Sequence, residues 1–173
     1  MKRMSTTKPG RARSADGAPL FDLEGFLPYE LSVVTNRISR AFARRYARTF
    51  GLSIAEWRVM AIVGAFAPLS SNAVCERAAM DKAKVSRAVS RLVGRRLLER
   101  ARDPGDGRLV ALALTEAGKA MHAAIVPLAR ETEAEVVSVL SETERGALRR
   151  ILRKLDARVR EIAPDSEDEG DPD

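Results

Sequence analysis

One segment of the chain changes abruptly from a helical spacing of apolar residues to a two-residue alternation. In residues 82–96 the apolar side chains recur at intervals of three and four, which predicts an amphipathic helix. Residues 97–102 and 108–114 alternate as strands do, and the Asp-Pro-Gly-Asp-Gly sequence at 103–107 favours a tight turn between them. A helix that runs directly into a β-hairpin leaves only a few folds open to this chain.

Three more helices are predicted before this segment. The first covers residues 28–50, and the second starts at a capping box at 53–56 and stops before Pro68. Ser71 is expected to cap a short third helix over 72–79.

Two helices are predicted after the hairpin. Thr115 opens a long helix, and a capping box at 141–144 begins a last helix that reaches Ile162. Asp81 is the N-cap expected for the helix that precedes the hairpin. The predicted fold class is therefore mainly α with a small β-hairpin, in the order four helices, hairpin, two helices.

Positive and negative charges are segregated along the chain. The net charge is +6, but residues 164–173 hold six acids and no base, whereas residues 1–19 hold five bases and one acid. We expect a disordered basic N-terminal arm and a disordered acidic tail around a folded part over 20–163. That part carries 25 bases and 17 acids, which favours a polyanionic partner. The tail is either a solvating terminus or a competitor for the basic body.

The composition excludes several classes of protein. A single cysteine, Cys75, and a single histidine, His122, rule out a disulfide scaffold and a zinc finger and provide no metal-ligand set. We find no nucleophile–base pair and no phosphate-binding glycine loop, so we expect no enzyme activity and no cofactor. No apolar stretch has the length of a membrane span. A cytoplasmic, nucleoid-associated protein is expected.

A short helix, a tight break, a second helix and a hairpin follow one another in winged helix-turn-helix domains. Nine bases and four acids lie between Asp81 and Arg108, which agrees with DNA as the partner. A helical wheel places four apolar side chains of the second helix on one face, which we expect to lie against the core: Val85, Ala88, Val89 and Leu92. Arg87 points away from them, where it can contact a guanine edge.

The predicted DNA contacts lie on the two helices and on the hairpin tip. They are Ser71, Lys82, Ala83, Lys84, Ser86, Arg87, Ser90, Arg91, Asp106 and Arg108. Small residues beside Arg87 allow close approach to a major groove, and the Lys and Ser side chains can contact phosphate. Asp106 can orient Arg108 toward a minor groove. The alternatives are an ordinary solvated basic helix and a surface ion pair at the tip.

Four separated motifs resemble those of the MarR family of bacterial transcription regulators. They are GLSIAEWRVM at 51–60, MDKAKVSRAVSRLV at 80–93, RARDPGDGR at 100–108 and LALTEAG at 112–118. The resemblance covers about residues 28–162. It implies a homodimer in which dimerisation helices over 28–50 and 116–162 interlock. Two winged helix-turn-helix domains, each over 53–115, would then bind an inverted-repeat operator in double-stranded DNA.

The sequence departs from the family pattern at two positions. Gly107 precedes Arg108 at a place where consecutive basic residues are usual in the family, so one cation of the hairpin tip is missing. Leu97 stands where a glycine is common, so the preceding helix must end in another way.

The resemblance also implies a small anionic aromatic effector, bound where the dimerisation helices meet the winged domain. Arg37 and Arg40 can neutralise a carboxylate, and Trp57 can stack on a ring. Alternatively, the arginines are solvated or paired across the dimer, and Trp57 belongs to the core. Cys75 and His122 are expected to be structural; the alternatives are a redox sensor and a ligand contact.

The basic helix and the resemblance together predict a sequence-specific DNA-binding regulator. It would repress a neighbouring operon, and binding of the effector would release it from the DNA. The alternative is an architectural DNA-binding protein without an effector, held on DNA mainly by charge.

Overall fold

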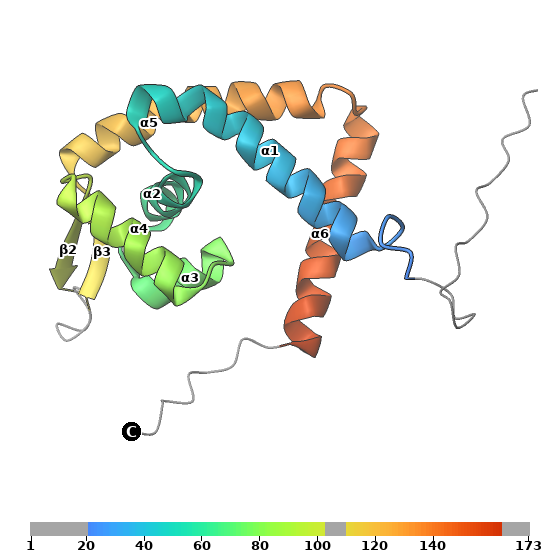
Figure 1. Cartoon of the computed structure of the whole chain (residues 1–173), viewed down its shortest axis with the longest axis horizontal. Helices are drawn as coiled ribbons and strands as arrows, with labels where there is room; N and C mark the ends of the chain where they lie inside the picture. The colour runs from blue at the N-terminus through green and yellow to red at the C-terminus, as the bar shows by residue number, and fades with distance from the viewer. Residues whose placement is uncertain (1–20, 103–109, 164–173) are drawn as a thin grey trace, which may run out of the picture. The chain divides into compact units, whose positions relative to one another are not determined.

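The computed structural model describes residues 21–102 and 110–163. Its elements (Figure 1) are α1 (Leu27–Phe50), α2 (Ile54–Phe66), β1 (Leu69–Ser70), α3 (Ser71–Ala78), α4 (Lys82–Gly94), β2 (Leu98–Arg102), β3 (Val110–Leu114), α5 (Glu116–Val137) and α6 (Glu142–Ile162). The mainly helical class and the predicted order of helices and hairpin are thus confirmed. The arms predicted at 1–19 and 164–173 lie outside the described residues.

The chain divides into two compact units, residues 1–40 and 41–173, so that α1 contributes to both. In the first unit, the Gly25 N–H donates to Asp22 Oδ1 at 3.1 Å just before α1. Among the described residues of this unit, eight large apolar side chains are exposed: Phe21, Leu23, Phe26, Leu27, Tyr29, Leu31, Val34 and Ile38.

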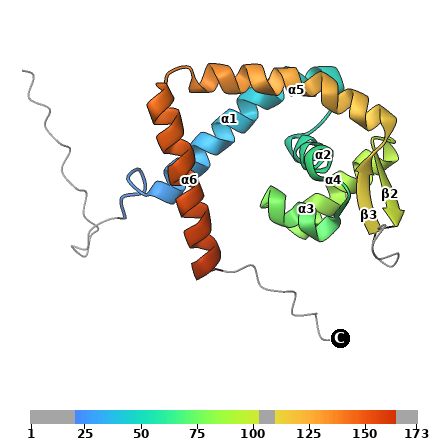
Figure 2. The ribbon, with the colours of Figure 1, turned by 180° about the vertical axis from the view of Figure 1, so that it is seen from behind.

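The core of the second unit is built around α2. In two opposite views α2 lies between α5 on one side and α3 and α4 on the other (Figures 1 and 2). On α2, Val59, Met60 and Val63 are completely buried. The side of α4 that faces this core carries the four residues given by the helical wheel, all buried: Val85, Ala88, Val89 and Leu92. That prediction is confirmed.

The hairpin has a third strand that the sequence pattern did not predict. β1 pairs antiparallel with β3, with Leu69 opposite Leu112, so the strand order is β1-β3-β2. Two residues are too few for an alternation to be visible in the sequence. β1 exists only because β3, distant along the chain, pairs with it.

Most helices begin at the caps expected from the sequence. In the capping box of α2, the Glu56 N–H donates to Ser53 Oγ at 3.2 Å, and the Ser53 N–H donates to Glu56 Oε2 at 2.7 Å. The box at 141–144 is also present, and Asp81 and Thr115 are the N-caps of α4 and α5.

The cap of α3 was predicted one residue too late. Ser70, not Ser71, accepts a hydrogen bond from the Ala73 N–H at 3.2 Å. Both serines carry the hydroxyl that a cap needs, but Ser70 is held in an extended conformation, as an N-cap must be. Its pairing with β3 accounts for that conformation.

α4 ends at an arginine with a left-handed backbone. Arg96 has φ of 57°, its N–H donates to Val93 O at 2.9 Å, and the Leu97 N–H donates to Leu92 O at 2.9 Å. This is the Schellman pattern, in which glycine usually holds the left-handed position. The family pattern led us to expect a glycine at Leu97, but the left-handed position at this helix end is Arg96, and Leu97 is instead buried in the core.

No single helix in the described part of the chain is long and apolar enough to cross a membrane. The bent pair α1–α2 meets that criterion of length and composition only when its two helices are taken together.

Candidate nucleic-acid interface

The polar face of α4 is exposed on the second unit. The Asp81 carboxylate accepts a hydrogen bond from the Lys84 N–H at 2.7 Å and fixes the start of the helix. The exposed residues of α4 include every predicted contact on this helix: Lys82, Ala83, Lys84, Ser86, Arg87, Ser90 and Arg91. Ser71 is exposed as the first residue of α3.

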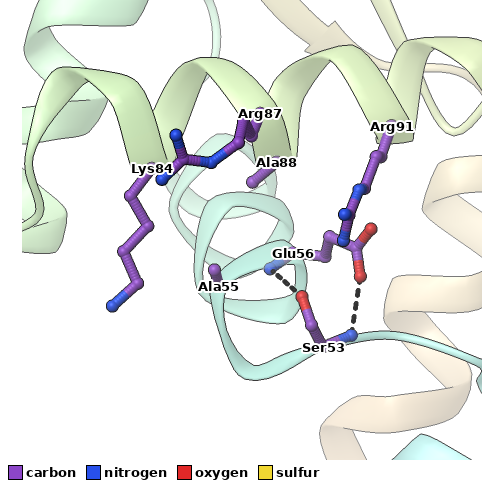
Figure 3. A pocket seen from close by; sticks show the side chains of 7 residues that line it. All are labelled: Ser53, Ala55, Glu56, Lys84, Arg87, Ala88 and Arg91. Carbon is purple, nitrogen blue, oxygen red and sulfur yellow. Dashed lines mark hydrogen bonds between the residues drawn. The ribbon is translucent and has the colours of Figure 1, made fainter.

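Three of these cations line an open pocket together with the first turn of α2 (Figure 3). The lining residues are Ser53, Ala55, Glu56, Lys84, Arg87, Ala88 and Arg91. No described acidic group makes an ion pair with any of these three cations. The Glu56 carboxylate is held by the Ser53 N–H instead.

The electrostatics of this pocket favour an anion. The first turn of a helix carries the positive end of the helix dipole. In α2 the Ser53 and Glu56 N–H groups are already taken by the capping box, and the Glu56 carboxylate adds one negative charge against the three cations. Ser53 and Ala55 place that end of α2 opposite the three cations of α4. The sequence predicted these cations, whereas the share of Ser53 and Ala55 follows only from the packing of α2 on α4.

The hairpin tip lies outside the described residues, and with it Asp106 and Arg108. Their predicted contact with a minor groove stays a prediction. On the described part of β2, Arg100 is exposed and lies opposite Leu112 of β3.

Four rings from three helices form an aromatic cluster: Phe42 and Tyr46 of α1, Trp57 of α2 and His122 of α5. The centroid of Trp57 lies 5.7 Å from that of Phe42 and 5.9 Å from that of Tyr46, and His122 stacks on Trp57 at 5.6 Å. A Cβ added to Gly64 would lie 2.9 Å from His122 Nε2, so this glycine allows the close approach of α5 to α2.

Burial dominates the chemistry of the cluster. It raises the pKa of Tyr46 to about 12, although Arg58 acts in the opposite direction. It also lowers the pKa of His122, so the imidazole is neutral near pH 7. Trp57 is half-buried within this cluster. The contact of His122 with Trp57 could not be predicted from the sequence, because it depends on how α5 packs on α2.

The three residues predicted to bind an effector are divided between the two units. Arg37 and Arg40 are exposed on the part of α1 that belongs to the first unit, and Trp57 belongs to the second.

Cys75 is half-buried on α3. Burial is the main cause that raises the pKa of its thiol, which disfavours the reactive thiolate and agrees with a structural role. The described residues contain no group of three or more His, Cys, Asp or Glu side chains that could hold a metal ion.

A short helix, a tight break, an exposed basic helix and an antiparallel hairpin together define a winged helix-turn-helix protein. Residues 50–109 match the family model described as the MarR family. The HTH-type transcriptional repressor NicR of Pseudomonas putida is 28% identical over 135 residues, which cover 74% of this chain and 85% of NicR. The chain belongs to the MarR family of transcriptional regulators.

Two solved structures of similar proteins share this fold. A probable transcriptional regulator from Pseudomonas aeruginosa is 30% identical, with a TM-score of 0.64, and the match covers 77% of this chain and 98% of that one. BpsR of Bordetella bronchiseptica, whose DNA binding is regulated by 6-hydroxynicotinic acid, is 26% identical, with a TM-score of 0.69 and coverage of 79% and 96%. The protein is therefore a DNA-binding transcriptional regulator and not an enzyme.

Proposed function

We propose that this regulator is a repressor that binds an inverted repeat in double-stranded DNA as a homodimer, with α4 in the major groove. One observation carries the proposal. Lys84, Arg87 and Arg91 are exposed together beside the first turn of α2, and no described acidic group pairs with them. A phosphate backbone is the anion that such a surface fits. Repression is inferred from the similarity to NicR.

The contacts divide into base readout and phosphate binding. Arg87 lies in the N-terminal half of α4, where a recognition helix meets base edges, and can bind a guanine in a bidentate manner. Lys82 and Lys84 lie at the start of the helix, where phosphates pass. The remaining proposed contacts are Ser71, Ala83, Ser86, Ser90, Arg91, Asp106 and Arg108.

The homodimer is supported by apolar surface that the single chain leaves uncovered. α6 has 21 residues and none of them is buried. Its exposed apolar residues recur at helical spacing along one face: Leu148, Ile151, Leu152, Val159 and Ile162. A stripe of this kind fits a second copy of the chain, and a two-fold dimer matches an inverted repeat.

Footprinting on the DNA that flanks the gene of this protein tests the proposal. We expect protection of one palindromic site. Gel shifts of that fragment and of a scrambled duplex at two salt concentrations should retain a clear preference for the fragment. An architectural protein without an effector would bind both duplexes equally, and its affinity for both would fall together as the salt concentration rises. That result would reject the regulator in favour of the alternative.

We further propose that a small aromatic acid binds near the aromatic cluster and releases the DNA. BpsR, which is similar over most of its length, responds to 6-hydroxynicotinic acid. The residues proposed for this ligand are those expected from the sequence: Trp57 as a ring for stacking, and Arg37 and Arg40 as partners of the carboxylate. The binding of an effector can change DNA affinity only if the effector prefers one of two conformations.

Trp57 is the only tryptophan of the chain, so its fluorescence reports directly on the cluster. A panel of aromatic carboxylates should contain a compound that changes this fluorescence, raises the melting temperature and weakens binding to the footprinted fragment. The same aromatic rings without a carboxylate are the matched control. A panel without any such compound would contradict the effector proposal and leave the DNA-binding proposal intact.

A further inference from the structure

The C-terminal end of α4 is fastened to the end of α1 by one side chain. Arg95 Nη1 donates to Gly51 O at 2.8 Å, and Arg95 Nη2 donates to Phe50 O at 2.8 Å. α1 ends here, since Gly51 has φ of 61° and its N–H closes the last turn on Ala47 O at 2.8 Å. Two carbonyls at a helix C-terminus form the negative end of the helix dipole, which a guanidinium stabilises.

The same end of α4 is held by α5 on another side. Thr115 Oγ1 donates to Arg96 O at 2.6 Å, and the Thr115 N–H donates to Leu97 O at 3.2 Å. A Cβ added to Gly118 would lie only 2.0 Å from Leu97 O, so the first turn of α5 lies directly against this carbonyl. The core face of α4 is packed along its length, and its C-terminal end is held in addition by the ends of two other helices.

These contacts distinguish Arg95 from the other basic side chains of α4. Its guanidinium is committed to α1 through two hydrogen bonds, whereas Lys84, Arg87 and Arg91 face the open pocket. Arg87 lies about 12 Å of helix away from Arg95. A tilt of α4 at its fastened end would move Arg87 relative to a base edge while α4 stayed folded.

We propose that Arg95 is a positioning residue for DNA recognition. It holds α4 at the angle at which Arg87 reaches the bases and does not itself contact DNA. The inference rests on the proposed use of α4 as the recognition helix. A lysine cannot replace Arg95, because an ammonium group on a flexible stem lacks the planar fork that spans two carbonyls.

The test compares Arg95→Gln and Arg95→Lys in the full-length protein, well below the melting temperature. Binding is measured to the footprinted fragment and to a scrambled duplex over a range of salt concentrations. We expect both variants to bind the fragment about tenfold more weakly, because without the two hydrogen bonds α4 holds the competent angle for only about a tenth of the time, and the apparent Kd rises in that proportion. Affinity for the scrambled duplex and the slope of log Kd against log salt should not change.

Phosphate binding by Arg95 would give a different pattern. Arg95→Lys would then keep its affinity, whereas Arg95→Gln would lose affinity for both duplexes and change the salt slope by about one. That pattern would overturn the inference. Arg130→Gln removes the same charge from an exposed position of α5 and should leave both affinities unchanged.

Hydrogen exchange adds a readout that does not involve DNA. In Arg95→Gln, peptides that contain the end of α1 and the end of α4 should exchange faster, while peptides from α6 should not. If exchange and specific binding were unchanged in Arg95→Gln while Arg87→Ala still weakened binding to the fragment, only the role of Arg95 would be refuted. If Arg87→Ala also had no effect, α4 would not be the recognition helix, and the proposed function would fail together with this inference.

Discussion

In the proposed function, sequence readout by α4 depends on Arg87. Replacement by alanine should cost about 1–3 kcal/mol on the footprinted fragment and little on random DNA, because a bidentate contact to a base edge carries sequence information. Lys84→Ala is the matched comparison. It should weaken binding to all sequences alike and lower the salt slope by about one. The assignment of the reading face would be wrong if Lys84→Ala changed the specific-to-random ratio and Arg87→Ala did not.

His122 links pH to stability through its place in the aromatic cluster. Burial holds its pKa below the ordinary value of 6.5, so the unfolded chain binds a proton more readily than the folded chain does. Its contribution to the free energy of unfolding is complete above pH 6.5 and is lost as pH falls through the lowered pKa. Urea unfolding between pH 7.5 and 5 should show this loss in the natural protein.

The control for this prediction is His122→Phe, which keeps a ring against Trp57 and Gly64 but does not titrate. In this variant the decrease in stability from pH 7.5 to 5 should be smaller. An identical pH profile would show that His122 does not carry the dependence. Glu144, whose pKa is lowered mainly by its hydrogen bond with the Ser141 side chain, titrates below its ordinary value of 4.5 and so outside this range.

At the scale of single elements, two helices end at left-handed residues that are not glycine. Arg96 after α4 has φ of 57° and Ala79 after α3 has φ of 48°. The left-handed conformation costs a residue with a Cβ about 1–2 kcal/mol. Glycine avoids this cost, but part of the gain is lost because glycine has more conformational entropy to lose when the chain folds. Arg96→Gly and Ala79→Gly should therefore each raise the free energy of unfolding by about 0.5–1 kcal/mol.

Urea denaturation of the two variants checks this prediction against a glycine placed inside α4. Ser90→Gly, at an exposed helical position, should lower the free energy of unfolding by about 0.5–1 kcal/mol. If all three variants were destabilised alike, the left-handed residues would store no relievable strain.

The elements that local pattern specifies were predicted well from the sequence. The core face of α4 and the capping boxes depend only on neighbours within one or two turns, and both are present. Features created by distant segments were missed, including β1 and the choice of Ser70 as a cap. The same division holds for the site. The exposed cations of α4 were predicted from its wheel, whereas the role of Arg95 depends on where α1 ends.

At the scale of the whole molecule, the uncovered apolar face of α6 determines the predicted assembly. Light scattering should give a mass twice the 18.9 kDa of one chain at micromolar concentration. Ile151→Glu places a charge in the middle of the apolar face and should dissociate the dimer, because an unpaired carboxylate cannot be buried there at low cost. A stable natural monomer at this concentration would contradict the dimer.

Assembly and operator recognition should fail together. Arg150→Glu introduces the same carboxylate on the opposite, polar face of α6 and should leave the dimer intact. Because two recognition helices related by a two-fold axis read the two halves of an inverted repeat, Ile151→Glu should lose most of its affinity for the footprinted fragment. Its binding to a scrambled duplex should fall much less, since charge alone supports that binding. If Ile151→Glu were monomeric and still bound the palindrome as tightly as Arg150→Glu, each chain would recognise DNA alone, and two-fold symmetry would not set the operator.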